Sequence, residues 1–182
     1  MLGLIFKGAF MQRLTQNDFD ALFSLMEKSF PADEYRDRAA QKALFDNPLY
    51  AVYGLKDGAA VKAFIATWQF SDFAFVEHFA VDPSCRNNGI GKKMLNDLIE
   101  HLGKPVCLEV EPPTSDITRR RIGFYERNGF FLNTYPYEQP PLSQGKKALR
   151  LHVMTSGAAA DERRFQKIKS ALYEKVYRVV TR

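Results

Sequence analysis

One stretch decides the fold, HFAVDPSCRNNGIGKKMLNDLI at residues 78–99. An apolar strand pattern runs up to Val81 and apolar residues at helical spacing begin at Ile90, so the loop between them leads into a helix start. The first turn of a helix offers free N–H groups and the positive end of the helix dipole, which together attract anions. Gly89 and Gly91 would let an anion approach the main chain closely.

The charges of this loop fit an anion site but do not name the anion. Arg86, Lys92 and Lys93 favour a negative ligand, whereas a tight turn with solvated charges is the alternative interpretation. The dinucleotide pattern G-x-G-x-x-G is absent, and the lysines after Gly91 do not complete the Walker pattern G-x-x-x-x-G-K-[ST]. The loop therefore predicts an anion site that follows neither of these two patterns.

Two motifs, in order along the chain, give a family resemblance. The first is V-D-P-x-x-R-x-x-G-I-G at residues 81–91, and the second is RRIGFYERNGFF at residues 120–131. Together they resemble the GNAT family of N-acetyltransferases, over roughly residues 11–154 and most closely over 75–131. The resemblance implies an α+β fold, an α/β/α sandwich whose mixed, mostly antiparallel central sheet contains a splayed strand pair.

By this resemblance the chain uses acetyl-CoA as cosubstrate, and no metal is expected. The pyrophosphate would lie on the amides of residues 86–91. The pantetheine arm would pair with backbone groups left free where the strand ending at Val81 and the strand starting at Val106 diverge. The residues implied in binding are Phe79, Ala80, Val81, Arg86, Asn87, Asn88, Gly89, Ile90, Gly91 and Lys92. Thr118 stands where the family often has an asparagine, and the loop PPTSDIT is longer, so the adenosine-side contacts are not carried over.

Three side chains are candidates for the chemistry of acetyl transfer. Tyr125 matches the family's tyrosine and is implied to protonate the leaving thiolate, while backbone N–H groups near residues 79–81 would stabilise the oxyanion. The base is Glu77 or Glu109, since each is an acid in an apolar strand and burial raises a carboxyl pKa. The alternatives are a core tyrosine, and a glutamate that contacts substrate or forms a salt bridge. His78 should point to the face opposite Glu77 and pack there.

The flanking sequence alternates between strand and helix periods. Strands are expected at 11–14, 49–55, 60–70, 73–81, 106–110, 130–135 and 148–154, and helices at 18–30, 35–45, 90–102, 117–128 and from 163 onward. The amine substrate would enter past residues 30–36 and the loop 136–147. Residues 30–36 also fit ordinary helix ends.

The positive net charge of +5 belongs to the tail. Residues 163–182 hold seven Lys or Arg and one acid, which leaves 19 basic and 20 acidic residues before them. An apolar stripe on this basic helix, at Phe165, Ile168, Leu172, Val176 and Val179, needs a protein surface to cover it. We therefore divide the chain into an acetyltransferase domain at 11–156 and a spacer with basic amphipathic helix at 157–182, the helix either docking in cis or forming a homodimer.

The remaining composition favours a cytoplasmic protein. Cys85 and Cys107 have no paired spacing, which fits a reducing compartment, and no run of residues is apolar enough to cross a bilayer. The first ten residues lack the features of a signal peptide, and translation could begin at Met1 or Met11.

The sequence therefore predicts an acetyl-CoA-dependent N-acetyltransferase acting on a primary amine of a small molecule or peptide. A non-catalytic acyl-CoA-binding or sensing domain of the same fold is one alternative, because a cofactor pocket does not guarantee turnover. A nucleic-acid-binding module built on the basic tail helix is the other, and it is disfavoured by the apolar stripe on that helix.

Overall fold

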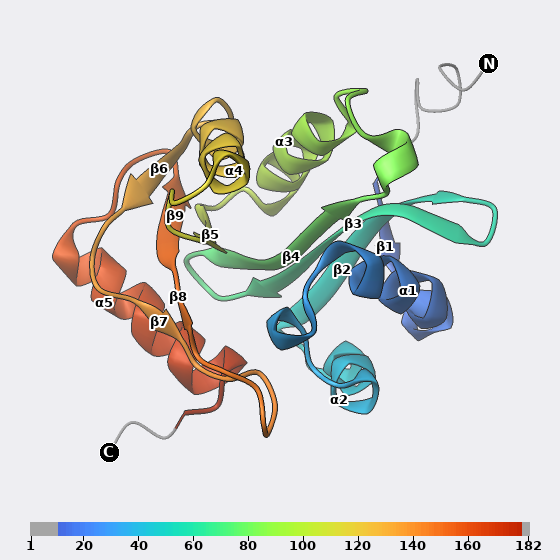
Figure 1. The fold of residues 1–182 in the computed structure, drawn as a ribbon, viewed down its shortest axis with the longest axis horizontal. Helices are drawn as coiled ribbons and strands as arrows, with labels where there is room; N and C mark the ends of the chain where they lie inside the picture. The colour runs from blue at the N-terminus through green and yellow to red at the C-terminus, as the bar shows by residue number, and fades with distance from the viewer. Residues whose placement is uncertain (1–10, 180–182) are drawn as a thin grey trace.

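A twisted seven-stranded sheet forms the centre of the computed structural model, which describes residues 11–179 (Figure 1). Its strand order is β1-β2-β3-β4-β5-β9-β6, and a separate two-stranded ribbon pairs β7 with β8. All pairings are antiparallel except that of β4 with β5. The strands are β1 (Gln12–Leu14), β2 (Tyr50–Asp57), β3 (Ala60–Gln69), β4 (Ala74–Val81), β5 (Val106–Val110), β6 (Phe130–Asn133), β7 (Glu138–Gln139), β8 (Leu149–Arg150) and β9 (His152–Ser156).

Helices cover both faces of the sheet. They are α1 (Phe19–Ser29), α2 (Arg38–Ala43), α3 (Ile90–Leu102), α4 (Asp116–Glu126) and α5 (Glu162–Ala171), which continues as a π-helical turn over Leu172–Val176. Side chains of α1 and α5 share one buried cluster with one face of the sheet, and side chains of α3 and α4 share a second cluster with the other face. The expected α/β/α sandwich is confirmed.

The only parallel pair in the described sheet is short. β4 and β5 pair at just three positions, from Ala74 opposite Val106 to Val76 opposite Leu108. At the next residue β4 is bulged: His78 pairs with Ala66 and Val76 with Thr67, so Glu77 is the extra residue against β3. Because a bulge bends its strand and increases its twist, β4 turns away from β5 at this point. This is the splayed pair implied by the family resemblance.

Several element boundaries differ from those expected. The helix predicted at 35–45 is α-helical only over Arg38–Ala43, because Asp37 caps its N-terminus and a 3₁₀ turn replaces its end. The strand predicted at 148–154 is two strands separated at Leu151, whose N–H donates to the carbonyl of Tyr137. The β7–β8 ribbon was not expected at all, since its strands are only two residues long.

The C-terminal helix docks on its own chain. Phe165, Ile168, Leu172 and Val176 are at most 3% exposed and lie in the same cluster as side chains of α1. Val179, the last residue of the expected stripe, is 36% exposed, so its inclusion was wrong. The helix ends before this residue, at Val176, and Arg178 has a left-handed φ of +54°, so Val179 no longer lies on a helical face.

We expect Leu172→Ala to lower the free energy of unfolding by about 3 kcal/mol, because it empties a fully buried position between α5 and the sheet. Urea unfolding followed by the fluorescence of Trp68, the one tryptophan of the chain and a member of the same cluster, measures the loss. Val179→Ala is the matched control and should change stability by less than about 0.5 kcal/mol. Equal effects of the two substitutions would contradict docking in cis.

Candidate functional site

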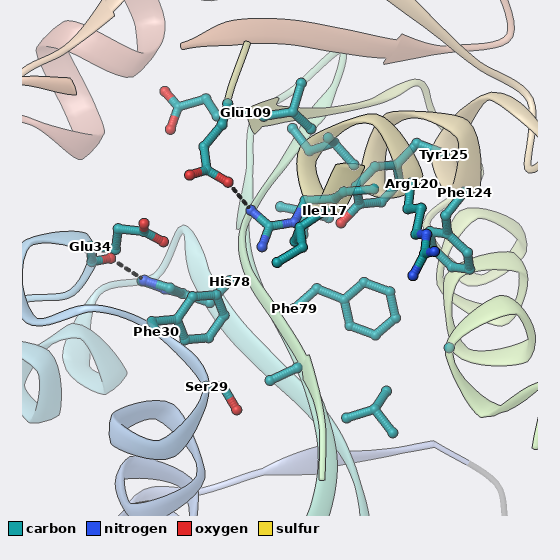
Figure 2. A pocket seen from close by; sticks show the side chains of 18 of the residues that line it. Ser29, Phe30, Glu34, His78, Phe79, Glu109, Ile117, Arg120, Phe124 and Tyr125 are labelled. Carbon is teal, nitrogen blue, oxygen red and sulfur yellow. Dashed lines mark hydrogen bonds and ion pairs between the residues drawn. The ribbon is translucent and has the colours of Figure 1, made fainter. Parts of the chain in front are cut away.

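A cleft of about 730 Å³ opens where β4 and β5 part (Figure 2). Its floor is formed by residues 76–81 of β4 and 108–111 at the end of β5, and its walls by the loop before α3, by α4 and by the segment after α1. Figure 2 shows Tyr125 and Phe124 on one side of this cleft and Phe30, Glu34 and His78 on the other. All three candidate catalytic residues and all the expected cofactor residues except Asn88 line it.

The loop before α3 presents its backbone to the cleft. Gly89 is the N-cap of α3 with φ +73°, and Asn87 also has positive φ at +64°. No side chain caps the helix, so the N–H groups of its first turn have no side-chain acceptor at the cap. The two left-handed residues turn the chain sharply before the helix. This arrangement suits a diphosphate on the main-chain amides.

The surroundings of this helix start also fit an anionic ligand. Gly91 faces Phe79 and Phe124, whose ring atoms would lie 3.5 and 3.6 Å from a Cβ at that position. Arg86 donates from Nε to the carbonyl of Val81 at 3.0 Å, which holds its guanidinium beside the loop. Lys92 is exposed and lines the same cleft. The residues present therefore fit the phosphates of CoA.

Glu109 lies on β5 just beyond the paired positions and is aimed at the cleft. Its carboxylate accepts hydrogen bonds from the hydroxyls of Tyr137 and Tyr177, the latter at 2.7 Å and 2.8 Å from its two oxygens. Burial raises the pKa of Glu109 to about 7, although the two hydroxyl donors oppose the rise. A carboxylate with this pKa exchanges a proton readily near neutral pH.

Glu77 has a different environment although it lies at the matching position of β4. Its side chain is 3% exposed and pairs with the guanidinium of Arg36, Nη1 to Oε1 at 2.7 Å. Burial alone would raise the pKa of Glu77, but the charge of Arg36 and the neighbouring His78 outweigh it and lower the pKa to about 2. Such a group is a poor proton acceptor at neutral pH, so its geometry favours the salt-bridge interpretation.

His78 does not point away from Glu77 as expected. Its Nδ1 lies 3.6 Å from Oε2 of Glu77, and its Nε2 is 2.7 Å from the backbone carbonyl of Glu34 (Figure 2). The bulge explains the error, since an extra residue interrupts the alternation of side chains between the two faces of β4. The ring still packs, in an edge-to-face contact with Phe30 at 5.0 Å between centroids.

Tyr125 projects from α4 between Phe124 and Phe130, with ring centroids at 5.3 and 5.7 Å. It is 9% exposed and lines the cleft, and its hydroxyl makes no hydrogen bond to another described residue. Burial raises the pKa of Tyr125 to about 12, so the phenol keeps its proton at neutral pH. An accessible, protonated hydroxyl without a protein partner is free to donate to a ligand.

Sequence reasoning missed several residues that shape this site. Arg120, Arg121 and Phe124 line the cleft from α4, beside the tyrosine that the motif identified. Tyr137 and Tyr177 lie behind Glu109, one in the loop before β7 and the other after the π-helical turn. The helical period of the second motif could have indicated the α4 residues. No local signal indicated the two tyrosines, because they reach Glu109 only through the tertiary fold.

The side of the cleft opposite α4 is formed by residues 29–34. Phe30 and Glu34 line it, and burial together with the charge of Glu111 raises the pKa of Glu34. Arg36, two residues farther along, does not line the cleft and pairs with Glu77. Residues 29–36 therefore do more than end a helix, since they contribute one wall of the cleft and one buried charge.

Between residues 11 and 179, no group of three or more His, Cys, Asp or Glu side chains is arranged to hold a metal ion. Within the same range, no helix is both long and apolar enough to span a membrane.

Comparison with known sequences identifies relatives of the chain. The profile of the acetyltransferase (GNAT) family matches residues 17–130. YjbC of Bacillus subtilis, a protein named as an acetyltransferase, is 30% identical over 110 residues, which cover 59% of this chain and 55% of the relative. The chain thus spans about half the length of this relative.

Comparison with solved structures identifies the same fold. A protein described as a GNAT-family acetyltransferase from Bacteroides thetaiotaomicron gives a TM-score of 0.86 at 35% identity, over 93% of this chain and 99% of the other. The yncA acetyltransferase of Salmonella typhimurium, solved with acetyl-CoA, gives 0.58 at 18% identity over 86% and 99%. The ribosomal-protein-S18-alanine N-acetyltransferase of Escherichia coli gives 0.63 at 22% identity over 85% and 97%. The last two identities are low and show the fold alone.

The Arg36–Glu77 pair gives a stability prediction. Arg36→Met should lower the free energy of unfolding at pH 7 by about 3–5 kcal/mol, because it leaves a buried carboxylate without its partner. The depressed pKa of Glu77 contributes stability above about pH 4.5 that is lost as the pH falls toward 2, so the difference between wild type and variant should narrow over that window. Urea unfolding at pH 7 and pH 3 measures both effects.

Two comparisons control this experiment. Arg119→Met removes an ion pair with Asp116 whose side chains are 56% and 84% exposed, and it should cost less than about 1 kcal/mol. Arg36→Met combined with Glu77→Leu should recover part of the loss, because the unpaired charge is removed as well. An Arg36→Met variant as stable as Arg119→Met would show that Glu77 is not held by this pair.

Proposed function

Because the chain belongs to the GNAT family of acetyltransferases, we propose that it transfers an acetyl group from acetyl-CoA to a primary amine of a small molecule or peptide. The amine would attack directly while both substrates are bound. One observation carries the proposal: a carboxylate with a pKa of about 7, Glu109, faces the same cleft as a helix N-terminus suited to a diphosphate.

Binding of CoA would use the main chain more than side chains. The amides of residues 86–91 would bind the pyrophosphate, with Arg86 and Lys92 beside it. The arm of CoA would run along β4 where that strand has lost its β5 partner, since backbone groups there lack a parallel neighbour. When bound in this way, acetyl-CoA supplies a reactive thioester at the point where the strands part.

Glu109 is proposed as the general base. An alkylammonium must lose a proton before its nitrogen can act as a nucleophile, and a carboxylate with a pKa near 7 can accept it at neutral pH. Glu77 is better suited to a structural role, because its ion pair with Arg36 keeps its pKa at about 2. We therefore give the two glutamates different roles in this proposal, with Glu109 as the base and Glu77 as a structural acid.

Tyr125 is proposed as the general acid. Its phenol keeps its proton at neutral pH, faces the cleft and makes no other hydrogen bond among the described residues, so it can donate toward the sulfur that leaves. Backbone N–H groups near residues 79–81 would stabilise the negative charge that develops on the thioester oxygen. The unpaired edge of β4 supports this assignment.

The amine would approach from the side formed by Phe30, Glu34 and His78. This side is opposite α4 and lines the same cleft as Glu109 (Figure 2), so an amine there would share the cleft with both the proposed base and the thioester. A carboxylate and aromatic rings offer favourable contacts to a cationic group. A non-catalytic sensing domain would bind CoA in the same cleft, and release of free thiol from acetyl-CoA with a panel of amines separates the two functions.

The base and acid assignments predict distinct losses of rate. Glu109→Gln should lower kcat/KM for acetyl transfer by at least about 100-fold, and Tyr125→Phe by about 10- to 100-fold, because each removes one proton transfer. For the wild type, the rate should rise with pH through about 7 as Glu109 ionises. Thiol release under initial-rate conditions, with calorimetric titration of CoA, measures catalysis and binding separately.

CoA should bind both variants within a few-fold of wild type, because the proposed pyrophosphate site is formed by the main-chain amides of residues 86–91 and not by these two side chains. Glu138→Gln, at an exposed glutamate of β7, serves as the matched control for loss of one carboxylate and should keep the full rate. Wild-type rates in both Glu109→Gln and Tyr125→Phe would remove these assignments. CoA binding without thiol release for any amine would favour the sensing domain.

The helix start predicts a specific loss of CoA affinity. Gly89→Ala should weaken CoA binding by at least about 10-fold, because a side chain strains a residue at φ +73° and shifts the amides that follow. Gly103→Ala is a matched control at the other end of α3, with φ +59° and equally open space around its Cα. Both variants should lose similar stability in thermal unfolding. Equal CoA affinity in the two variants would place the diphosphate elsewhere.

A further inference from the structure

Two tyrosine hydroxyls hold Glu109 from behind the cleft. Tyr177 lies within 2.7 and 2.8 Å of its two oxygens, and Tyr137 donates to one of them. Neither tyrosine lines the cleft, although Glu109 does. The two hydroxyls therefore contact the proposed base on the side away from the substrates, where they can orient it without touching either substrate.

The position of Tyr177 is set by the C-terminal segment, residues 172–177. Leu172 and Val176 anchor the segment in the core at 0% and 3% exposure. The N–H of Tyr177 donates to the carbonyl of Leu172 at 3.0 Å, which closes the π-helical turn. Nη2 of Arg36 donates to the carbonyl of Val176 at 3.1 Å. Tyr177, which follows Val176, is thus held in place by the packing of its neighbours and by these two hydrogen bonds.

The π-helical turn affects the direction in which the side chain of Tyr177 points. Such turns insert one residue into an α-helix and often occur at functional sites, because the extra residue changes the direction of the side chains that follow. Here the turn ends directly before Tyr177, and its hydroxyl reaches a carboxylate 68 residues earlier in the chain.

We propose that Tyr177 and Tyr137 are positioning residues for Glu109, so that the C-terminal segment is a working part of the acetyl-transfer site. This inference rests on the proposed function, in which Glu109 is the base. A base must present a lone pair to the ammonium in one orientation, and donors on its other lone pairs fix that orientation. Hydroxyl donors also stabilise the charged form of a carboxylate that burial disfavours.

Other groups around Glu109 act on its charge in known directions. On β4, the charge of Glu77 disfavours a second carboxylate and His78 favours it. On β5 itself, the nearby thiol is Cys107, and burial followed by the charge of Glu109 raises the pKa of that thiol. Tyr137 and Tyr177 are the hydrogen-bond donors to Glu109 among the described residues. Loss of one hydrogen-bond donor should therefore raise the pKa of Glu109.

The test is the pH profile of Tyr177→Phe in the whole chain of 182 residues. The acid limb of kcat/KM should move to higher pH by about one unit, because a hydrogen bond to a charged group is worth roughly 1.5–3 kcal/mol and one pH unit is 1.36 kcal/mol. The rate should fall about 10-fold below the limb and recover above it. Tyr137→Phe removes the second donor and should shift the limb in the same direction.

Tyr173→Phe is the matched control. Tyr173 belongs to the same aromatic group, with its ring centroid 6.4 Å from that of Tyr177, but its hydroxyl donates to the backbone carbonyl of Glu138. The acid limb of kcat/KM for Tyr173→Phe should stay at the wild-type pH. An unmoved limb in Tyr177→Phe, or an equal movement in Tyr173→Phe, would overturn the proposal while leaving the acetyl-transfer function intact.

A second measurement does not depend on turnover. In protein labelled with ¹³C at glutamate carboxyls, Glu109 is assigned by its loss in Glu109→Gln, and its titration should move upward by about one unit in Tyr177→Phe. An unchanged titration would refute the role of Tyr177 whether or not any amine is acetylated. A shifted titration in a protein that releases no thiol would support the contact and refute the proposed function instead.

Discussion

The site depends on one constraint in the sheet, which is that β4 and β5 can pair at only three positions. The bulge at Glu77 bends β4 just as the pairing ends, and the two strands cannot rejoin farther along. Backbone groups that would have bonded to each other instead face a cleft of about 730 Å³. The sheet continues on both sides of this gap, since β3 supports β4 and β9 supports β5. A rigid scaffold therefore surrounds an opening suited to an extended ligand.

The same gap places two glutamates at equivalent positions, and their neighbours give them opposite properties. Glu77 meets the charge of Arg36, which keeps it ionised far below neutral pH. Glu109 meets neutral hydroxyls, which satisfy its oxygens without fully offsetting burial. A guanidinium fixes the charge of a carboxylate, whereas hydroxyls leave it able to gain and lose a proton. The identity of the neighbour, more than burial, separates the structural acid from the candidate base.

Local signals in the sequence predicted the parts of the site that are local. The loop at residues 86–91, the helix after it and Tyr125 all depend on residues close together in the chain, and the structure gathers them on one cleft. The choice between Glu77 and Glu109 depends on Arg36 and Tyr177, which lie 41 and 68 residues from the carboxylates they contact. No periodicity reports such contacts. The expected orientation of His78 was wrong for a related reason, because one bulged residue moves every later side chain of the strand to the other face of the sheet.

The tail shows how a surface feature in the sequence becomes part of the interior. Its basic residues suggested a partner, yet its apolar stripe lies in the same cluster as α1 and the sheet. The segment then supplies a carbonyl to Arg36 and a hydroxyl to Glu109, so it contacts the structural ion pair and the candidate base at once. Loss of its packing would leave Arg36 without one acceptor and Glu109 without one donor. Folding of the last helix and ionisation of the cleft are therefore coupled through the same few hydrogen bonds.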